Sequence, residues 1–247
     1  MGAIPARYAS TRLPGKPLRL IAGRPMIEHV VRRAQAVEGL TRVVVLTDDQ
    51  RIADAVEGFG GDVEMTPAHC ASGTDRIAWA ARSWPEEAVV NIQGDEPLLD
   101  PGSIAAVAKH LREHREDPMV TLAAPLEARE LEDPNAVKVV VDHGGYALYF
   151  SRAPIPWFRD PDARRNSFSD PRKTLAKKHI GIYGYQRQTL LQLAELPPAP
   201  LEQAEALEQL RALAHGISLR VLVVERAAPG VDTEEDLARV EALLTAS

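Results

Sequence analysis

The chain has 247 residues, 45% of them hydrophobic and 26% charged, with a formal net charge of −6. These are ordinary globular values, and the net negative charge argues against a broad nucleic-acid-binding surface. No apolar run reaches the roughly 18 residues of a membrane-spanning helix, and no apolar signal-peptide core precedes the first arginines. The single cysteine, Cys70, excludes an intramolecular disulfide and a thiolate metal site. We therefore expect a cytoplasmic protein with no membrane or nucleic-acid partner.

The first part of the chain alternates between short apolar runs and helical patterns. Strands are expected at Gly2–Pro5, Arg42–Thr47, Asp62–Met65 and Val89–Gln93. Helices are expected at Pro25–Ala36, Arg51–Phe59, Thr74–Trp84 and Pro101–Arg115. This alternation predicts parallel strands joined by right-handed crossovers.

The second part predicts a change to a mixed sheet. Further strands are expected at Met119–Pro125, Ala136–Asp142, Tyr146–Phe150, Ile180–Tyr185 and Leu219–Val224. Helices are expected at Gln186–Ala194, Leu201–His215 and Thr233–Leu244. Gly144-Gly145 indicates a hairpin, and the polar, aperiodic stretch Phe158–Lys178 indicates an exposed loop. We expect one α/β domain over residues 1–247, with an inserted hairpin and loop lobe at about residues 136–185.

A basic loop follows the first strand. Arg7, Arg12 and Lys16 lie there, and no acidic residue occurs before Glu28. A loop between a strand and a helix can hold phosphates with its N–H groups, and arginine forks match phosphate oxygens. A solvated basic loop explains the same pattern, and the residues alone leave both interpretations open.

Two carboxylates follow strand-like runs far apart in the sequence. Asp95 ends V-V-N-I-Q-G-D, and Asp232 lies in G-V-D-T before the last helix. Each either caps a helix or contributes to a Mg²⁺ site, since Mg²⁺ prefers carboxylate and phosphate oxygens. From the residues alone the cap is favoured for Asp95. Asp48-Asp49 likewise favours a helix cap over a second metal site.

The basic loop also carries a family pattern. Pro5-Ala6-Arg7, followed by Ser10, Arg12-Leu13-Pro14-Gly15-Lys16 and Pro17-Leu18, resembles the signature loop of the sugar-acid cytidylyltransferases. Further matches follow in order at Thr47-Asp48, Ser72–Arg76, Asn91–Pro97, Pro134–Lys138, Ala147–Arg152, His179–Tyr185 and Val231–Thr233. The resemblance therefore covers nearly the whole chain. It implies a three-layer, Rossmann-like nucleotidyltransferase fold with a mostly parallel mixed sheet.

The resemblance also implies an activity. In this family the hydroxyl of a sugar acid attacks the α-phosphate of CTP and pyrophosphate leaves, with Mg²⁺ as cofactor. The pattern is closest to members that use 3-deoxy-manno-octulosonate (KDO) and make CMP-KDO for lipopolysaccharide biosynthesis. It implies a homodimer, formed through the inserted lobe.

Residue roles follow from the same resemblance. It implies that CTP is bound by Arg7, Ser10, Arg12, Lys16, Ser72, Arg76 and Gln93, and that catalysis depends on Arg12, Lys16, Asp95 and Asp232, with Asp95 and Asp232 as metal ligands. Without it, Ser72 is an ordinary helix N-cap and Gln93 a polar residue closing a strand.

The sugar acid is expected at a second group of residues. The resemblance implies contacts from Gln93, Arg152, Arg159, His179, Tyr183, Glu205 and Gln209. His179 and Tyr183 are four apart on a strand and so face one side, which also fits a core-facing pair. Glu205 and Gln209 share a face of one expected helix, which also fits a solvated stripe.

Two alternatives remain open at the level of function. One is a cytidylyltransferase for a related acid sugar, 8-amino-KDO or sialic acid. Sialic-acid relatives tend to carry a Gly-Gly-Ser-Lys-type loop, whereas this chain has Tyr8-Ala9-Ser10-Thr11-Arg12. The other is a nucleotide-binding module without turnover, against which the two carboxylates argue.

Overall fold

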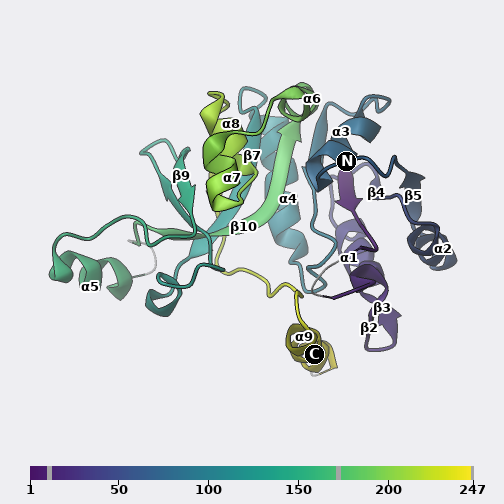
Figure 1. Cartoon of the computed structure of the whole chain (residues 1–247), viewed down its shortest axis with the longest axis horizontal. Coiled ribbons are helices and arrows are strands. Elements are labelled where there is room, and N and C mark those ends of the chain that lie inside the picture. Colours follow the sequence, from purple (N-terminus) through teal and green to yellow (C-terminus); the bar gives the residue numbers. More distant parts are fainter. Residues whose placement is uncertain (10–12, 171–173, 246–247) are drawn as a thin grey trace. The chain divides into compact units, whose positions relative to one another are not determined.

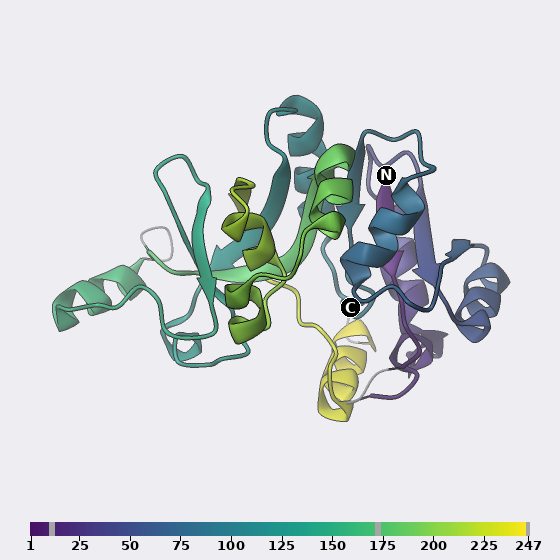
Figure 2. The same ribbon diagram turned by 45° about the horizontal axis from the view of Figure 1, so that its top comes forward.

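The computed structural model describes residues 1–9, 13–170 and 174–245, so the predicted site residues Ser10 and Arg12 lie outside the described part. The chain divides into two compact units, each of which is described by itself (Figures 1 and 2). Unit 1 comprises Met1–Glu113, Gly184–Ala194 and Ala228–Ser247, and unit 2 comprises His114–Tyr183 and Glu195–Ala227. Most of the expected lobe at residues 136–185 belongs to unit 2, and the expectation of a single domain stays a prediction.

Unit 1 is built on a parallel sheet. Its strands lie in the order β6 (Ala88–Asn91), β1 (Gly2–Pro5), β4 (Val43–Thr47) and β5 (Asp62–Met65). All three neighbouring pairs are parallel, as the alternating pattern predicts. Every residue of β4 is buried, which is typical of a parallel strand covered on both faces. Because the strands are parallel, the carboxyl ends of β1 and β6 lie at one edge of the sheet.

The helices of unit 1 follow the expected pattern closely. They are α1 (Met26–Gln35), α2 (Gln50–Gly58), α3 (Gly73–Ala81), α4 (Pro101–Glu113), α6 (Arg187–Glu195) and α9 (Glu234–Thr245). A 3-10 turn, η1 (Lys16–Leu18), and a small hairpin of β2 (Leu20–Ile21) and β3 (Arg24–Pro25) precede α1. Helix α1 buries Ile27, Val30 and Val31, the residues whose spacing predicts it.

Unit 2 contains the mixed part of the fold. Its elements are β7 (Met119–Pro125), η2 (Ala128–Glu130), β8 (Lys138–Val141), β9 (Ala147–Ser151), α5 (Pro161–Ser169), β10 (Lys177–Gln186, in unit 1 from Gly184 on), α7 (Pro200–Glu205), α8 (Gln209–Ala214) and β11 (Leu219–Val223). Strand β11 pairs with β7 in parallel, whereas β8 pairs antiparallel with β9 and β10. The expected hairpin is confirmed, as is the mostly parallel mixed α/β sheet.

Two expectations in unit 2 are wrong. The stretch expected as a loop at Phe158–Lys178 contains helix α5, which Asp160 caps by accepting a hydrogen bond from Asp162 N at 2.9 Å. The expected helix Leu201–His215 is two helices, because Ala206 adopts a left-handed conformation with φ of 50°. Glu202 and Arg211 form a largely buried pair across this break, 2.5 Å apart. Such a contact between residues nine apart requires the chain to turn.

Candidate active site

A polar pocket lies in unit 1 at the carboxyl ends of β1 and β6. Its volume is about 320 Å³, and its lining combines the basic loop with the loop after β6 and the start of the α9 segment. The lining residues are Pro5, Ala6, Arg7, Ala9, Lys16, Pro17, Gln93, Gly94, Asp95 and Asp232. The edge of a parallel sheet beyond its strand ends is where α/β proteins bind ligands.

Lys16 is placed by the turn that closes the basic loop. Gly15 has φ of 66°, a left-handed conformation, and a Cβ there would lie 3.1 Å from the Tyr8 ring. Gly15 N also donates to Tyr8 O at 3.1 Å, which closes the loop. Lys16 then begins η1, and its side chain is only 13% exposed. A residue larger than glycine would disturb this turn and the lysine that follows it.

Asp95 is placed by a close approach of two loops. A Cβ at Gly94 would lie 3.2 Å from Pro5 O, so glycine allows the loop after β6 to pass tightly against the end of β1. Asp95 does not cap the next helix. Asp100 does so instead, because its Oδ2 accepts from Ser103 N at 2.9 Å. The cap favoured for Asp95 from the residues alone is therefore wrong.

Asp232 reaches the same point from the other end of the chain. Val231 N donates to Asp95 O at 2.9 Å, which ties the two segments together. The cap of α9 is Thr233, whose Oγ1 accepts from Asp236 N at 3.2 Å, so Asp232 is not the helix cap. Lys16 Nζ lies 2.6 Å from Asp95 Oδ2 and 2.9 Å from Asp232 Oδ1. The structure thus brings the two predicted carboxylates to one ammonium group.

The electrostatics of this cluster follow from its packing. Burial alone would lower the pKa of Lys16, but Asp95 and Asp232 outweigh it and raise that pKa above its ordinary value. The pKa of the neighbouring Glu96 carboxyl is also raised, to about 8, but here burial is the main cause and the charge of Asp95 adds to it, so the neutral acid is favoured. At neutral pH Lys16 therefore carries a full positive charge beside two carboxylates.

The donor set fits a magnesium ion bound together with a polyphosphate. Among the described residues no group of three or more His, Cys, Asp or Glu side chains gathers as a metal site. Mg²⁺ commonly takes one or two carboxylates and completes its shell with water and substrate phosphates. Asp95 and Asp232 supply such a pair, and the Lys16 ammonium between them shows that the position accommodates a cation.

Arg7 extends the positive charge along the pocket. Its Nη2 donates to Cys70 O at 2.8 Å, so the guanidinium is held by the loop that precedes α3. Gln93 lines the same pocket, with its Nε2 3.5 Å from Asn91 Oδ1. Arg7, Gln93 and Lys16 are thus gathered as the resemblance implies.

Ser72 and Arg76 are engaged within the protein. Ser72 Oγ accepts from Asp75 N at 3.0 Å, and Asp75 Oδ2 accepts from Ser72 N at 2.9 Å, a reciprocal capping box at the start of α3. Arg76 is completely buried, with Nη2 3.2 Å from Asp48 Oδ2. Arg76 is not among the described residues that line the pocket, and its expected contact with the nucleotide stays a prediction. Asp48 pairs with it, and Asp49 caps α2.

In unit 2, His179 and Tyr183 face the same side of β10, as expected. Their ring centroids are 5.4 Å apart, and His179 Nε2 lies 2.9 Å from Thr121 Oγ1. Burial lowers the pKa of His179 to about 3. The ring is therefore neutral at physiological pH and suits hydrogen bonding rather than charge pairing with an acid sugar.

Arg152, Glu205 and Gln209 also lie in unit 2, where Glu205 and Gln209 are arranged differently from the expectation. Arg152 donates through Nε to Glu205 O at 2.8 Å and through Nη1 to Pro134 O at 3.0 Å, and Glu205 accepts from Ser151 Oγ at 2.6 Å. Glu205 and Gln209 do not share a helix face, because α7 ends before α8 begins. Gln209 is 4% exposed, and its Nε2 has no partner among the described residues.

Arg159 is exposed in the segment before α5. Its role in binding the sugar acid stays a prediction.

One residue that supports the site was missed from the sequence. Asp236 Oδ2 accepts from both Asp232 N and Thr233 N at 3.1 Å, which fixes the backbone that carries the Asp232 carboxylate. The spacing of Thr233 and Asp236 is that of a capping box, and this spacing could have predicted the contact of Asp236 with the backbone.

Comparisons with known proteins agree with this site. The family model described as cytidylyltransferase matches residues 1–221. The 3-deoxy-manno-octulosonate cytidylyltransferase of Syntrophotalea carbinolica is 52% identical over 98% of this chain and 96% of its own. That of Myxococcus xanthus is 49% identical over 100% of this chain and 96% of its own. A solved structure of CMP:2-keto-3-deoxy-manno-octonic acid synthetase complexed with CTP has a TM-score of 0.92 at 42% identity, covering 99% of this chain and 98% of that one.

Fold, pocket and comparisons together define an α/β nucleotidyltransferase. More narrowly, the chain belongs to the cytidylyltransferase family. No helix in the described residues has the length and apolar character needed to cross a membrane.

Proposed function

We propose that the protein transfers CMP from CTP to 3-deoxy-manno-octulosonate, releasing pyrophosphate. The observation that carries this is the meeting of Asp95 and Asp232 at the Lys16 ammonium in a pocket that Arg7 also lines. The full-length likeness to proteins of this activity supports the choice of both substrates. The product, CMP-KDO, is the activated sugar used in lipopolysaccharide biosynthesis.

The chain's own groups supply positioning and charge. Lys16 and Arg7 bind the phosphates of CTP, and each offsets repulsion between the negatively charged oxygens. A hydroxyl of the sugar acid releases its proton to solvent and forms a bond to the α-phosphorus, and the bond from that phosphorus to the bridging oxygen breaks. Pyrophosphate is the leaving group, so no covalent enzyme intermediate is required. Alignment of the reacting groups and electrostatic stabilisation of the transition state are sufficient to accelerate such a transfer.

We propose Mg²⁺ as the cofactor, held by Asp95 and Asp232. When bound, Mg²⁺ would lower the pKa of the attacking hydroxyl and would offset the negative charge at the α-phosphate. Lys16 must then exchange its two carboxylate contacts for phosphate oxygens, which the flexible lysine side chain permits.

The acceptor is proposed to contact residues of unit 2. The unpartnered, buried Nε2 of Gln209 is a hydrogen-bond donor that a sugar hydroxyl would satisfy. The neutral His179 ring and Tyr183 offer further hydrogen bonds at one side of β10. Arg152, whose guanidinium is held by backbone carbonyls, and Arg159 supply positive charge for the sugar carboxylate.

A homodimer is also proposed. Unit 2 exposes large apolar side chains, with Trp157 at 87%, Leu148 at 62% and Leu175 at 60% exposure. Exposed apolar side chains of this size mark protein contact surfaces when they gather. Light scattering coupled to size exclusion tests this, since a mass near 27.0 kDa would exclude the dimer.

The catalytic proposal is tested by incubating the protein with CTP, Mg²⁺ and KDO and identifying the product by mass spectrometry. A CMP-linked KDO supports it. Tight CTP binding with no CMP-sugar formed would show a nucleotide-binding module without turnover.

A further inference from the structure

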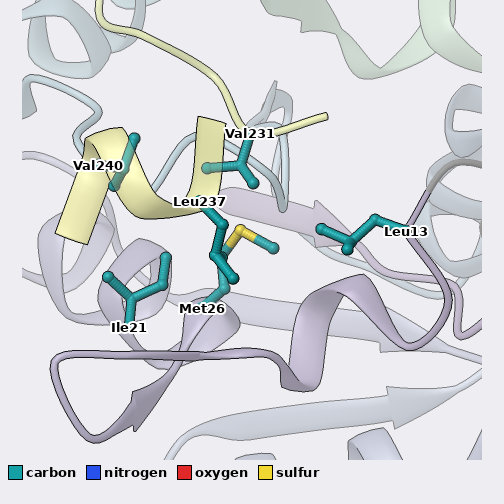
Figure 3. Packing of buried hydrophobic residues seen from close by; sticks show 6 residues of the cluster. All are labelled: Leu13, Ile21, Met26, Val231, Leu237 and Val240. Atoms are coloured by element: carbon teal, nitrogen blue, oxygen red, sulfur yellow. The ribbon is translucent and has the colours of Figure 1, made fainter. Parts of the chain in front are cut away.

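An apolar cluster joins the terminal helix to the basic loop. It consists of Leu13 from the loop, Ile21 from β2, Met26 from α1, and Val231, Leu237 and Val240 from the α9 segment (Figure 3). Each of these side chains is at most 9% exposed. In Figure 3, Leu237 points from α9 toward Met26, while Leu13 lies at the opposite side of the cluster from Val240.

Residues of this cluster lie close in sequence to two charged residues of the proposed site, Lys16 and Asp232. Leu13 precedes Lys16 on the basic loop, and Val231 immediately precedes Asp232. Lys16 and Asp232 are 216 positions apart in sequence, yet their side chains are 2.9 Å apart. Sequence neighbours cannot enforce that distance, so contacts between distant segments must do so, and this cluster supplies the apolar part of them.

Helix α9 depends on this cluster for its buried apolar contacts, and Ala22 N adds an exposed hydrogen bond to Glu241 Oε1 at 2.9 Å. It is 12 residues long, and its buried side chains are Leu237 and Val240. Isolated helices of this length are marginal in water, so tertiary contacts decide whether such a helix stays docked. Arg19 adds a two-pronged contact to Glu234, at 2.6 and 2.8 Å, but both side chains are exposed and such pairs contribute little.

We propose that Leu237 is a positioning residue for nucleotide transfer: its packing against the basic-loop cluster holds Asp232 beside Lys16 and Asp95. The expected change in kinetics rests on the proposed function. The docking of α9 against the cluster does not depend on that function. Helix α9 therefore couples to the nucleotide. Binding of CTP with a divalent cation favours the docked helix, and the docked helix favours binding to the same extent, because such coupling is reciprocal.

The first test is hydrogen exchange of the wild-type protein with and without CTP and Mg²⁺. Backbone amides of Glu234–Thr245 should exchange more slowly with both present, and Mg²⁺ alone should have a smaller effect. Unchanged exchange across α9, in a sample where bound CTP is demonstrated, would overturn the proposal. This readout does not depend on turnover.

The second test is the kinetics of Leu237→Ala. We expect the half-saturating concentrations of CTP and Mg²⁺ to rise roughly 5- to 150-fold, the range typical of coupling between two sites. The KM for KDO should stay near the wild-type value. Leu237→Met, which keeps nearly the same volume, should restore both concentrations.

Leu111→Ala is the matched control. Leu111 is 2% exposed on α4 in unit 1 and lies outside the cluster. Both alanine variants are assayed at temperatures that give equal folded fractions. If Leu111→Ala shifts the CTP and Mg²⁺ dependence as much as Leu237→Ala, the effect is general destabilisation and the proposal fails.

Val240→Ala keeps the proposal testable if Leu237→Ala does not fold, because it removes a smaller side chain of α9 from the same cluster. It changes no charge near the anionic nucleotide. A rise in the half-saturating CTP concentration supports positioning by this packing, and an unchanged concentration contradicts it. A wild-type protein that binds CTP and protects α9 but releases no pyrophosphate would refute the proposed function and not this inference.

Discussion

Replacing Lys16 by methionine removes the ammonium and keeps most of the aliphatic stem. The wild-type group makes contacts of 2.6 and 2.9 Å to Asp95 and Asp232. Its side chain is 13% exposed, while those of the carboxylates are 37% and 47% exposed. Exposed pairs contribute roughly 0.2–1 kcal/mol each, and breaking a buried pair costs roughly 3–5 kcal/mol. With the carboxylates this accessible to solvent, we expect Lys16→Met to lower the free energy of unfolding by about 1–2 kcal/mol.

The same variant should respond differently to metal. Two carboxylates left without their ammonium repel one another, and Mg²⁺ can relieve that repulsion without CTP. Urea unfolding at pH 7 should therefore show Mg²⁺ stabilising Lys16→Met more than it stabilises the wild type. Lys109→Met, at an exposed position of α4, is the matched control and should match the wild type. A Lys16→Met protein as stable as the wild type, with no added response to Mg²⁺, would refute this account of the cluster.

Three further predictions concern other charged groups. Asp95→Asn and Asp232→Asn should each lower kcat by orders of magnitude while circular dichroism stays native, and near-full activity of either would remove that residue from the metal site. His179 has a folded-state pKa of about 3 against an ordinary value of 6.5, so the unfolded chain takes up the proton first. Wild-type stability should accordingly fall as pH drops from 6.5 toward 3, and His179→Gln should fall less steeply in urea titrations across that range. Arg76→Met should cost about 2–4 kcal/mol in urea unfolding, because Asp48 loses its partner, and an unchanged midpoint would contradict that.

The sheet of unit 1 was predictable because its strands have recognisable local sequence patterns. The apolar run at Val43–Thr47 has no polar side that could face solvent, and this pattern predicts a buried parallel strand. The hairpin at Gly144-Gly145 was equally visible, since few residues other than glycine adopt positive φ, and Gly145 has φ of 81°. Local sequence and final fold agree at these positions.

The role of Asp95 could not be predicted from the neighbouring residues alone. Asp95 and Asp100 are both candidates for capping α4, and only the structure shows that Asp100 takes the cap. Asp232 and Thr233 present the same ambiguity, and Thr233 takes the cap of α9. The resemblance anticipated both metal candidates because it used residues from the whole chain rather than from one turn.

The remaining differences arise from tertiary packing. Ala206 adopts a left-handed conformation that alanine rarely shows, and the pair of Glu202 and Arg211 accompanies this break in the expected helix. Arg76 has the charge of a ligand-binding residue, yet it is fully buried against Asp48. Helix α5 has a weak apolar face and begins at an aspartate cap followed by proline, a signal that its many charged residues obscured.

The central claim is transfer of CMP from CTP to KDO, and initial rates of pyrophosphate release test it most directly. The protein is supplied with CTP and Mg²⁺ and with KDO, 8-amino-KDO or sialic acid in turn, with Asp95→Asn as the background. The account predicts the highest kcat/KM with KDO and a rate near background with sialic acid. Release with sialic acid while KDO is inert would contradict it.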